Sequence, residues 1–287
     1  MVSYYVKVLP QILEYNKHVK LVADLFFAVQ VPFFRHCLTI SSSPPLAYPL
    51  QEELPDSQSK KNVKNIYHSR GFHIHNTLMY GELAPLKGEL GCEGIQVNLT
   101  YSNKHVLKIE RQIRVIKESV RANRHNMPFK VIPWIMLIDM IYSSTLWING
   151  FPPKGGVSET YTPRNIMTNI QFDFNRNYHL PFRSYAQAHY EPSRKNIQAA
   201  RTVGTICIGL TGKLKGSYKL LNLFTGKRTT RRKQTPLPIP QEVIDRVDQL
   251  IKAEYQPKLP TFFDGKGRLI GENKQADTYL QPGEYDT

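Results

Sequence analysis

The apolar residues between His105 and His125 repeat with the period of an amphipathic helix. They follow one another at steps of three, four, three and four residues: Val106, Ile109, Ile113, Ile116 and Val120. This spacing places them on one helical face. Six of the other positions are Lys or Arg, and Glu110 and Glu118 are the only carboxylates among them. The pattern predicts a helix over 105–125 on which Glu110 either pairs with Arg114 or holds a metal or a proton.

Short apolar runs on either side of this helix predict the rest of an α/β core. The expected strands lie within 18–40, where Gln30 and Pro32 separate two of them, and within 71–80 and 95–101. Residues 60–70 and 133–149 are expected to be helical, the second of these with Pro133 in its first turn. This order of strands and helices indicates a mixed sheet with flanking helices over residues 1–150.

The second half of the chain has a different pattern. Residues 151–200 lack clear periodicity and contain several Pro and Gly, so we interpret them as a connector packed on the core. Two short apolar runs then alternate with turn-forming strings such as TGKLKGS, and they predict a small basic β-module over 201–240. Residues 241–256 predict a short amphipathic helix, and 257–287 a loosely ordered tail.

The charge of the chain is strongly positive and unevenly placed. Lys and Arg number 38 against 23 Asp and Glu, which gives a net charge of +15. Between Arg194 and Gln234, eleven basic residues occur with no acidic residue. Such an excess favours a polyanionic partner, with nucleic acid first, but it does not indicate a fold.

Cysteine usage and hydropathy limit the environment in which the protein works. The three cysteines lack the CxxC spacing of a zinc site, so no structural zinc is expected. Their sparse, odd number favours a reducing compartment. No apolar run reaches the about 18 residues of a membrane span, and the N-terminus lacks the order of a signal peptide. We therefore expect an intracellular protein, nuclear or cytoplasmic, with no membrane partner.

Asp24 is a carboxylate inside an apolar strand segment, VADLFF. A buried charge there is costly unless it is paired or binds a metal. One interpretation is an Asp at a strand end that accepts backbone amide hydrogen bonds. The other joins Asp24 to Glu110, because acids from a central strand and a later helix can hold two divalent ions about 3.5–4 Å apart. Mg²⁺ or Mn²⁺ would suit such hard oxygen ligands.

Six strings of this sequence, in this order, resemble the integrase region of copia-type retrotransposon polyproteins. They are HVKLVADLFFAVQVPFF, NVKNIYHSRGFHI, HVLKIERQIRVIKESVR, LIDMIYSSTLWINGFP, YTPRNI and GSYKLLNLFTGKRTTRRKQTPLPIP. The resemblance runs from about Leu9 to Gly271. It implies a ribonuclease-H-like mixed sheet with flanking helices, a small β-barrel-like module after it, and a catalytic signature of Asp, Asp and Glu. Asp24 matches the first Asp, and Glu110, in the string IER, matches the Glu.

The second Asp of that signature has no match in this chain. The corresponding strand ends MYGEL, so Tyr80 occupies the position of the acid. A tyrosine phenol, with a pKa of about 10, stays protonated near neutral pH and is a poor Mg²⁺ ligand. Glu82 is the candidate substitute, because it is two residues on along an extended strand, but it would be displaced by roughly 6–7 Å. Asp24 and Glu110 would then share one ion, with a weak second site.

The resemblance also implies a DNA-binding surface. Integrases of this kind follow the catalytic core with a small β-barrel that contacts the DNA backbone, which gives affinity without sequence readout. We expect phosphate contacts from Arg111, Arg114, Lys117, Lys213, Lys215, Lys219, Lys227, Arg228, Arg231, Arg232 and Lys233. The alternative is a solvated basic surface without a ligand.

Three functions remain open from the sequence. The first is a retrotransposon integrase-derived DNA-binding protein that has lost most or all strand-transfer activity. The second is an active Mg²⁺- or Mn²⁺-dependent integrase that uses Asp24, Glu82 and Glu110. The third is a host-adopted interaction protein without nucleic-acid function. The zinc module and the reverse transcriptase that accompany such integrases have no match here, so we expect a piece of a longer polyprotein or a decayed genomic copy. A homo-oligomer is also expected, because integrases generally act as multimers.

Overall fold

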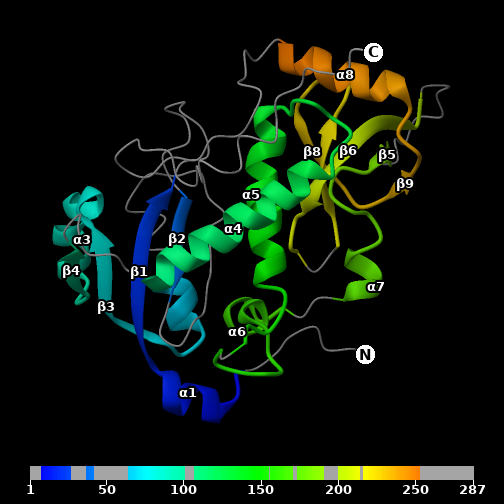
Figure 1. The fold of residues 1–287 in the computed structure, drawn as a ribbon. Helices are drawn as coiled ribbons and strands as arrows, with labels where there is room; N and C mark the ends of the chain where they lie inside the picture. The colour runs from blue at the N-terminus through cyan, green and yellow to red at the C-terminus, as the bar shows by residue number, and fades with distance from the viewer. Residues whose placement is uncertain are drawn as a thin grey trace, which may run out of the picture.

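The computed structural model describes residues 8–26, 37–41, 64–100, 107–154, 156–170, 173–190, 200–213 and 216–252. They form two sheets, with helices between and beside them (Figure 1). The first sheet contains β1 (His18–Phe26), β2 (Cys37–Ser41), β3 (His73–Tyr80) and β4 (Gln96–Thr100). The second contains β5 (Tyr185–His189), β6 (Thr202–Leu210), β7 (Tyr218–Asn222), β8 (Arg228–Arg231) and β9 (Gln234–Pro236). The helices are α1 (Pro10–Asn16), residues 64–69, η1 (Gly81–Leu86), α3 (Lys87–Cys92), α4 (Leu107–His125), α5 (Trp134–Ile148), α6 (Pro163–Thr168), α7 (Phe174–Asn177) and α8 (Gln241–Lys252).

The first sheet is mixed, as the sequence predicts. Its order is β2-β1-β3-β4. Strands β1, β3 and β4 run parallel, whereas β2 pairs with β1 in the antiparallel sense. Parallel neighbours require long crossover connections, and η1 with α3 forms the crossover between β3 and β4. The carboxyl ends of the three parallel strands therefore lie at the same edge of this sheet.

The predicted amphipathic helix is present as α4, and four of the predicted apolar positions form its buried face. Ile109, Ile113, Ile116 and Val120 are all at most 6 % exposed. Burying one such side chain stabilises the fold by about 1.5–3 kcal/mol, against a few tenths for an i,i+4 salt bridge on the exposed face. The apolar stripe, rather than the charges, therefore fixes the position of this helix.

Helices α4 and α5 lie between the two sheets and connect their cores. Helix α4 packs against β1, β2 and α5, and α5 packs against β6 (Figure 1). One continuous apolar cluster joins Val22 of β1 and Ile113 of α4 to Met140 of α5, Ile208 of β6 and Val247 of α8. The segment around β6 is therefore joined to the first sheet through these two helices.

The opposite face of the first sheet is covered by a second cluster. Val19, Leu21 and Met79 pack there with Phe72 and with Met167 of α6. A capping residue fixes the start of α6, since Thr162 Oγ1 accepts a hydrogen bond from the Asn165 amide at 3.0 Å. This is the interaction that favours threonine at a helix N-cap.

The second sheet is antiparallel, in the order β8-β7-β6-β5-β9. Strands β8 and β9 lie at opposite edges, yet only residues 232 and 233 separate them in sequence. Three peptide steps span at most about 10–11 Å, so the sheet must be rolled for both edges to meet there. No pairing between β8 and β9 is found among the described strands, so the sheet is open rather than a closed barrel.

The boundaries of the second half differ from those predicted. Strand β5 lies inside the segment 151–200 that the sequence indicates as a connector, and it is the strand between β6 and β9. The five-stranded sheet thus begins at Tyr185, not at 201. The sequence missed β5 because YAQAH has little apolar character, although its two alanines are fully buried. The predicted tail, 257–287, lies outside the described residues.

Candidate functional site

The carboxyl ends of the parallel strands bring two of the candidate positions together. The last pairs between β1 and β3 are Val22 with Leu78 and Ala23 with Met79. Asp24 and Tyr80 are the next residues of the two strands, so they occupy neighbouring register positions. Tyr80 is in turn paired with Thr100 of β4. Ligands of open α/β sheets bind beyond this end of the strands.

The same positions share the face on which α4 packs. Val22 and Leu78 both pack in the cluster that contains Ile109 of α4. Positions two residues apart on a strand lie on the same face, so positions 24 and 80 lie on the α4 side. The side chains of both residues lie outside the described part of the structure.

Glu110 lies in the first turn of α4, directly after Ile109, and is half-buried. The partial positive charge of a helix N-terminus stabilises an acid at this place. The structure thus puts positions 24 and 80 on the face of the first sheet against which α4, the helix that carries Glu110, packs.

Glu82 does not occupy the place that the sequence predicts. Strand β3 ends at Tyr80, and residues Gly81–Leu86 form the 3₁₀ helix η1. The expectation of an extended strand through Glu82 is therefore wrong, because the backbone turns immediately after Tyr80. The argument that Glu82 shares a strand face with position 80 no longer applies.

The predicted basic face of α4 is narrower than the sequence indicates. Arg111 and Arg114 are exposed, but Lys117 is only 4 % exposed. Lys117 is four residues after Ile113 and three before Val120, and both of these are in the core. A core-facing stripe on a surface helix includes such i+4 neighbours, so Lys117 belongs to the buried side and is not presented to a polyanion.

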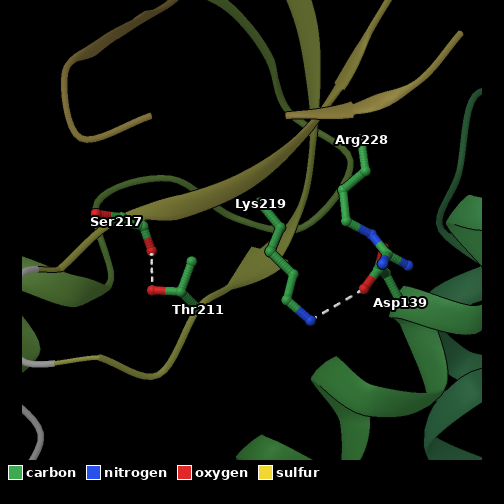
Figure 2. Close-up of polar contacts among 5 residues, drawn as sticks. All are labelled: Asp139, Thr211, Ser217, Lys219 and Arg228. Atoms are coloured by element: carbon green, nitrogen blue, oxygen red, sulfur yellow. Dashed lines mark hydrogen bonds and ion pairs between the residues drawn. The ribbon is translucent and has the colours of Figure 1, made fainter. Parts of the chain in front are cut away.

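Two basic residues of the second sheet bind a buried acid of α5 (Figure 2). The Asp139 side chain is fully buried; its Oδ2 accepts from Arg228 Nε at 2.7 Å, and its Oδ1 accepts from Lys219 Nζ at 3.2 Å. Burial raises the pKa of the Asp139 carboxyl, and the nearby ammonium and guanidinium groups oppose that rise. Lys219 and Arg228 therefore anchor β7 and β8 to α5.

Sequence reasoning missed Asp139, although a signal was present. A single acid stands in the otherwise apolar string IMLIDMIY, and a buried carboxylate needs a cationic partner. The partners are about 80 and 89 residues away in sequence, so the periodicity of α5 alone does not identify them.

Other basic residues of the second sheet remain at the surface. Lys213, Lys227, Arg232 and Lys233 are exposed, Arg231 is half-buried, and Lys215 lies outside the described residues. The turn that carries Lys213 is closed where Thr211 donates its amide and hydroxyl hydrogens to the Ser217 carbonyl at 3.0 and 2.9 Å (Figure 2). The exposed cations thus lie on a turn and at a rolled sheet edge rather than in the core.

No helix within the described ranges is both long and apolar enough to cross a membrane.

Among known proteins, the chain matches solved structures but neither family models nor curated proteins. Among solved structures, a similar chain occurs in the cryo-electron microscopy structure of the simian T-cell lymphotropic virus intasome in complex with the PP2A regulatory subunit B56 gamma. It is 9 % identical, over 83 % of this chain and 85 % of that chain, with a TM-score of 0.34. At this level of similarity, neither its fold nor its function transfers to this chain.

Proposed function

We propose that this chain is an integrase-derived DNA-binding protein, ribonuclease-H-like by ancestry, whose strand-transfer activity is impaired. The observation that carries the proposal is the register of β1 and β3, which puts Tyr80 beside Asp24. Both positions lie on the face packed by α4, with Glu110 in the first turn of that helix. A two-ion site needs carboxylates at all three positions, and here one is a phenol.

The donor set at this place does not fit a pair of divalent ions. Carboxylate oxygens at 24 and 110 suit Mg²⁺, but a protonated phenol at 80 supplies no charge. We therefore assign no catalytic step to this chain.

The proposed DNA-binding surface consists of the exposed cations of the second sheet together with α4. It comprises Arg111, Arg114, Lys213, Lys227, Arg231, Arg232 and Lys233. Arg228 and Lys219 are not included because the Asp139 carboxylate engages both. Phosphate contacts of this kind would be independent of sequence and would weaken steeply with salt.

Strand transfer on a short duplex with Mn²⁺ tests the impaired site. We expect the wild-type protein to stay at the background level of Glu110→Gln, and Tyr80→Asp to rise above it. Asp24→Asn in the Tyr80→Asp background is the matched control and should remove any gain. Wild-type activity above the Glu110→Gln background would favour the alternative, an active divalent-metal-dependent integrase. No gain in Tyr80→Asp would refute position 80 as the lesion.

Duplex binding across a salt series tests the DNA partner. We expect affinity to fall linearly on a log–log scale as salt rises, with a slope of about −0.9 for each phosphate contacted. A flat response, or no binding at low salt, would favour the remaining alternative, a host-adopted interaction protein without nucleic-acid function.

A further inference from the structure

Four aromatic side chains gather where the end of α5 meets α7, and we call them the aromatic patch. Trp147 lies in the last turn of α5 and Phe151 follows that helix, four residues on. Phe174 begins α7, and Tyr178 follows it, again four residues on. The Tyr178 amide donates a hydrogen bond to the Phe174 carbonyl at 3.1 Å, which holds the second pair in a helical turn. The distance in sequence between the two pairs hides this patch.

The rings contact one another both within and between the two pairs. Trp147 and Phe151 are stacked, with their ring centroids 6.0 Å apart and their planes at 13°, and Phe174 and Tyr178 are stacked at 4.9 Å and 23°. Between the pairs, the ring centroids of Trp147 and Tyr178 are 4.2 Å apart, and those of Phe151 and Phe174 are 6.1 Å apart. Interacting aromatic side chains have such separations, about 4.5–7 Å. Each of the four rings therefore has two neighbours in the patch.

The aromatic patch is anchored in the core and yet accessible to solvent. Tyr178 is half-buried and packs against the apolar cluster that contains Leu180. Trp147, Phe151 and Phe174 are 37 %, 49 % and 51 % exposed. Leaving such large apolar side chains in water forgoes stabilisation that their burial would supply, and contiguous exposed apolar patches mark binding sites. The mutual contacts fix the rings in place while their outer parts remain open to a ligand.

The patch adjoins the exposed cations that follow β8. His179, the residue after Tyr178, accepts a hydrogen bond from the Gln234 side-chain amide at 3.1 Å. Gln234 comes directly after Arg232 and Lys233, and both of these are exposed. The aromatic patch is therefore continuous with one group of cations on the proposed DNA-binding surface.

A second connection joins the patch to the turn that carries the exposed Lys213. The Arg164 guanidinium donates a hydrogen bond to the Gly212 carbonyl, directly before Lys213. Burial raises the pKa of the Tyr178 phenol to about 12, and the positive charge of Arg164 opposes that rise, so the guanidinium lies near the patch as well. Proteins that bind single-stranded nucleic acid combine such elements, because cations contact the phosphates while aromatic rings stack on the bases.

We propose that the aromatic patch stacks on unpaired bases of a DNA strand whose phosphates contact the neighbouring cations. The inference rests on the proposed DNA-binding function and adds the form of DNA that the surface prefers. Stacking on an aromatic side chain raises affinity by about five- to 150-fold for each base, whereas the bases of a duplex are already stacked on one another. Asp173, the acid beside Phe174, is half-buried and is outnumbered by the exposed cations described above. This basic frame favours a polyanion over an apolar protein surface.

Fluorescence anisotropy of the full chain with two labelled oligonucleotides tests the proposal. One is a thymidine strand, and the other is an abasic strand of the same length, which has the same phosphates and no bases. We expect the wild type to bind the thymidine strand at least about tenfold more tightly than the abasic strand.

Matched variants separate stacking from apolar contact. Phe151→Leu with Phe174→Leu keeps apolar side chains but removes two aromatic faces, so it should reduce the preference for the thymidine strand at least about fivefold. The slope of log affinity against log salt should stay the same, because the phosphate contacts are retained. Phe151→Tyr with Phe174→Tyr restores the aromatic faces and should restore the preference. Tyr15→Ala, at an exposed aromatic residue of α1, is the control and should bind like the wild type.

The outcomes distinguish this inference from the proposed function on which it rests. Equal binding of the two strands by the wild type would overturn the inference and leave the proposed function standing, whereas no binding of either strand at low salt would refute both. A preference that survives in the folded leucine variant, as checked by circular dichroism, would place stacking elsewhere and also overturn it. So would a wild-type dimer, detected by sedimentation, that the leucine variant dissociates without any change in strand preference, because the patch would then join two copies of the chain.

Discussion

Replacement of Asp139 by asparagine tests whether the buried ion cluster holds the second sheet to α5. The substitution keeps the volume of the side chain and removes its charge, so Lys219 and Arg228 lose their shared counter-ion. We expect the free energy of unfolding to fall, and the cause is the loss of pairing rather than a cavity.

The size of the effect follows from how exposed the two cations are. Breaking a buried ion pair by removing one partner costs about 3–5 kcal/mol. The side chains of Lys219 and Arg228 keep 18 % and 34 % of their exposure, so both can turn toward water once the carboxylate is gone. The introduced amide also retains an oxygen acceptor. We therefore expect a loss of about 2–3 kcal/mol, below the range of a fully buried pair.

Urea denaturation followed by circular dichroism at neutral pH measures this loss. Glu93→Gln is the matched control, because it breaks an ion pair of similar length, Lys64–Glu93 at 2.9 Å, in which both partners are partly exposed. That control should cost at most about 1 kcal/mol. If Asp139→Asn costs no more than Glu93→Gln, the cluster does not hold the sheet and the reasoning fails.

Three further predictions follow from the described contacts. In the DNA salt series, Lys233→Gln should reduce the slope of log affinity against log salt by about 0.9. Arg228→Gln should leave that slope unchanged and lower the urea midpoint of unfolding. An equal loss of slope in both variants would show that Arg228 also contacts DNA. Gly212→Ala should lower the free energy of unfolding by about 1–2 kcal/mol, because φ is +70° and the new Cβ would lie 2.9 Å from a guanidinium nitrogen of Arg164. Gly88→Ala, which has open space around it, is the control and should not lower it. Ile208→Ala in β6 should cost about 2–5 kcal/mol and lower amide-exchange protection in α4 as much as in β6; protection lost in β6 alone would mean that the two sheets unfold independently.

The periodicity of the sequence was sufficient to predict α4, α5, α8 and the mixed sheet, since each carries a long or clearly bounded apolar pattern. It failed at two places. Lys117 was assigned to the basic face although its local i+4 relation to Ile113 puts it on the core side of α4. YAQAH forms a strand because the distant strands β6 and β9 pair with it. Register and burial supply this information, and composition does not.

The candidate acid site was predicted in part. The sequence identified the elements that carry Asp24, Tyr80 and Glu110, and the structure brings those elements to one side of the first sheet. The end of the strand near Tyr80 and a loop or short helix from Gly81 also follow from the sequence, and η1, which begins at Gly81, removes the strand argument for Glu82.

On the function proposed above, the location of Tyr80 would explain how a chain could lose a catalytic acid and keep its fold. Leu78 and Met79 of β3 pack in the described core, and Tyr80 follows them at the last position of the strand. Carboxylates gathered around a metal site repel one another and raise each other's pKa, so replacing one of them removes an unfavourable interaction rather than a stabilising one. Ile109, Met140 and Ile208, by contrast, are fully buried in the core that joins both sheets, and truncating any of them costs several kcal/mol. Selection for a folded, basic surface would therefore preserve α4 and β6 without any constraint on position 80.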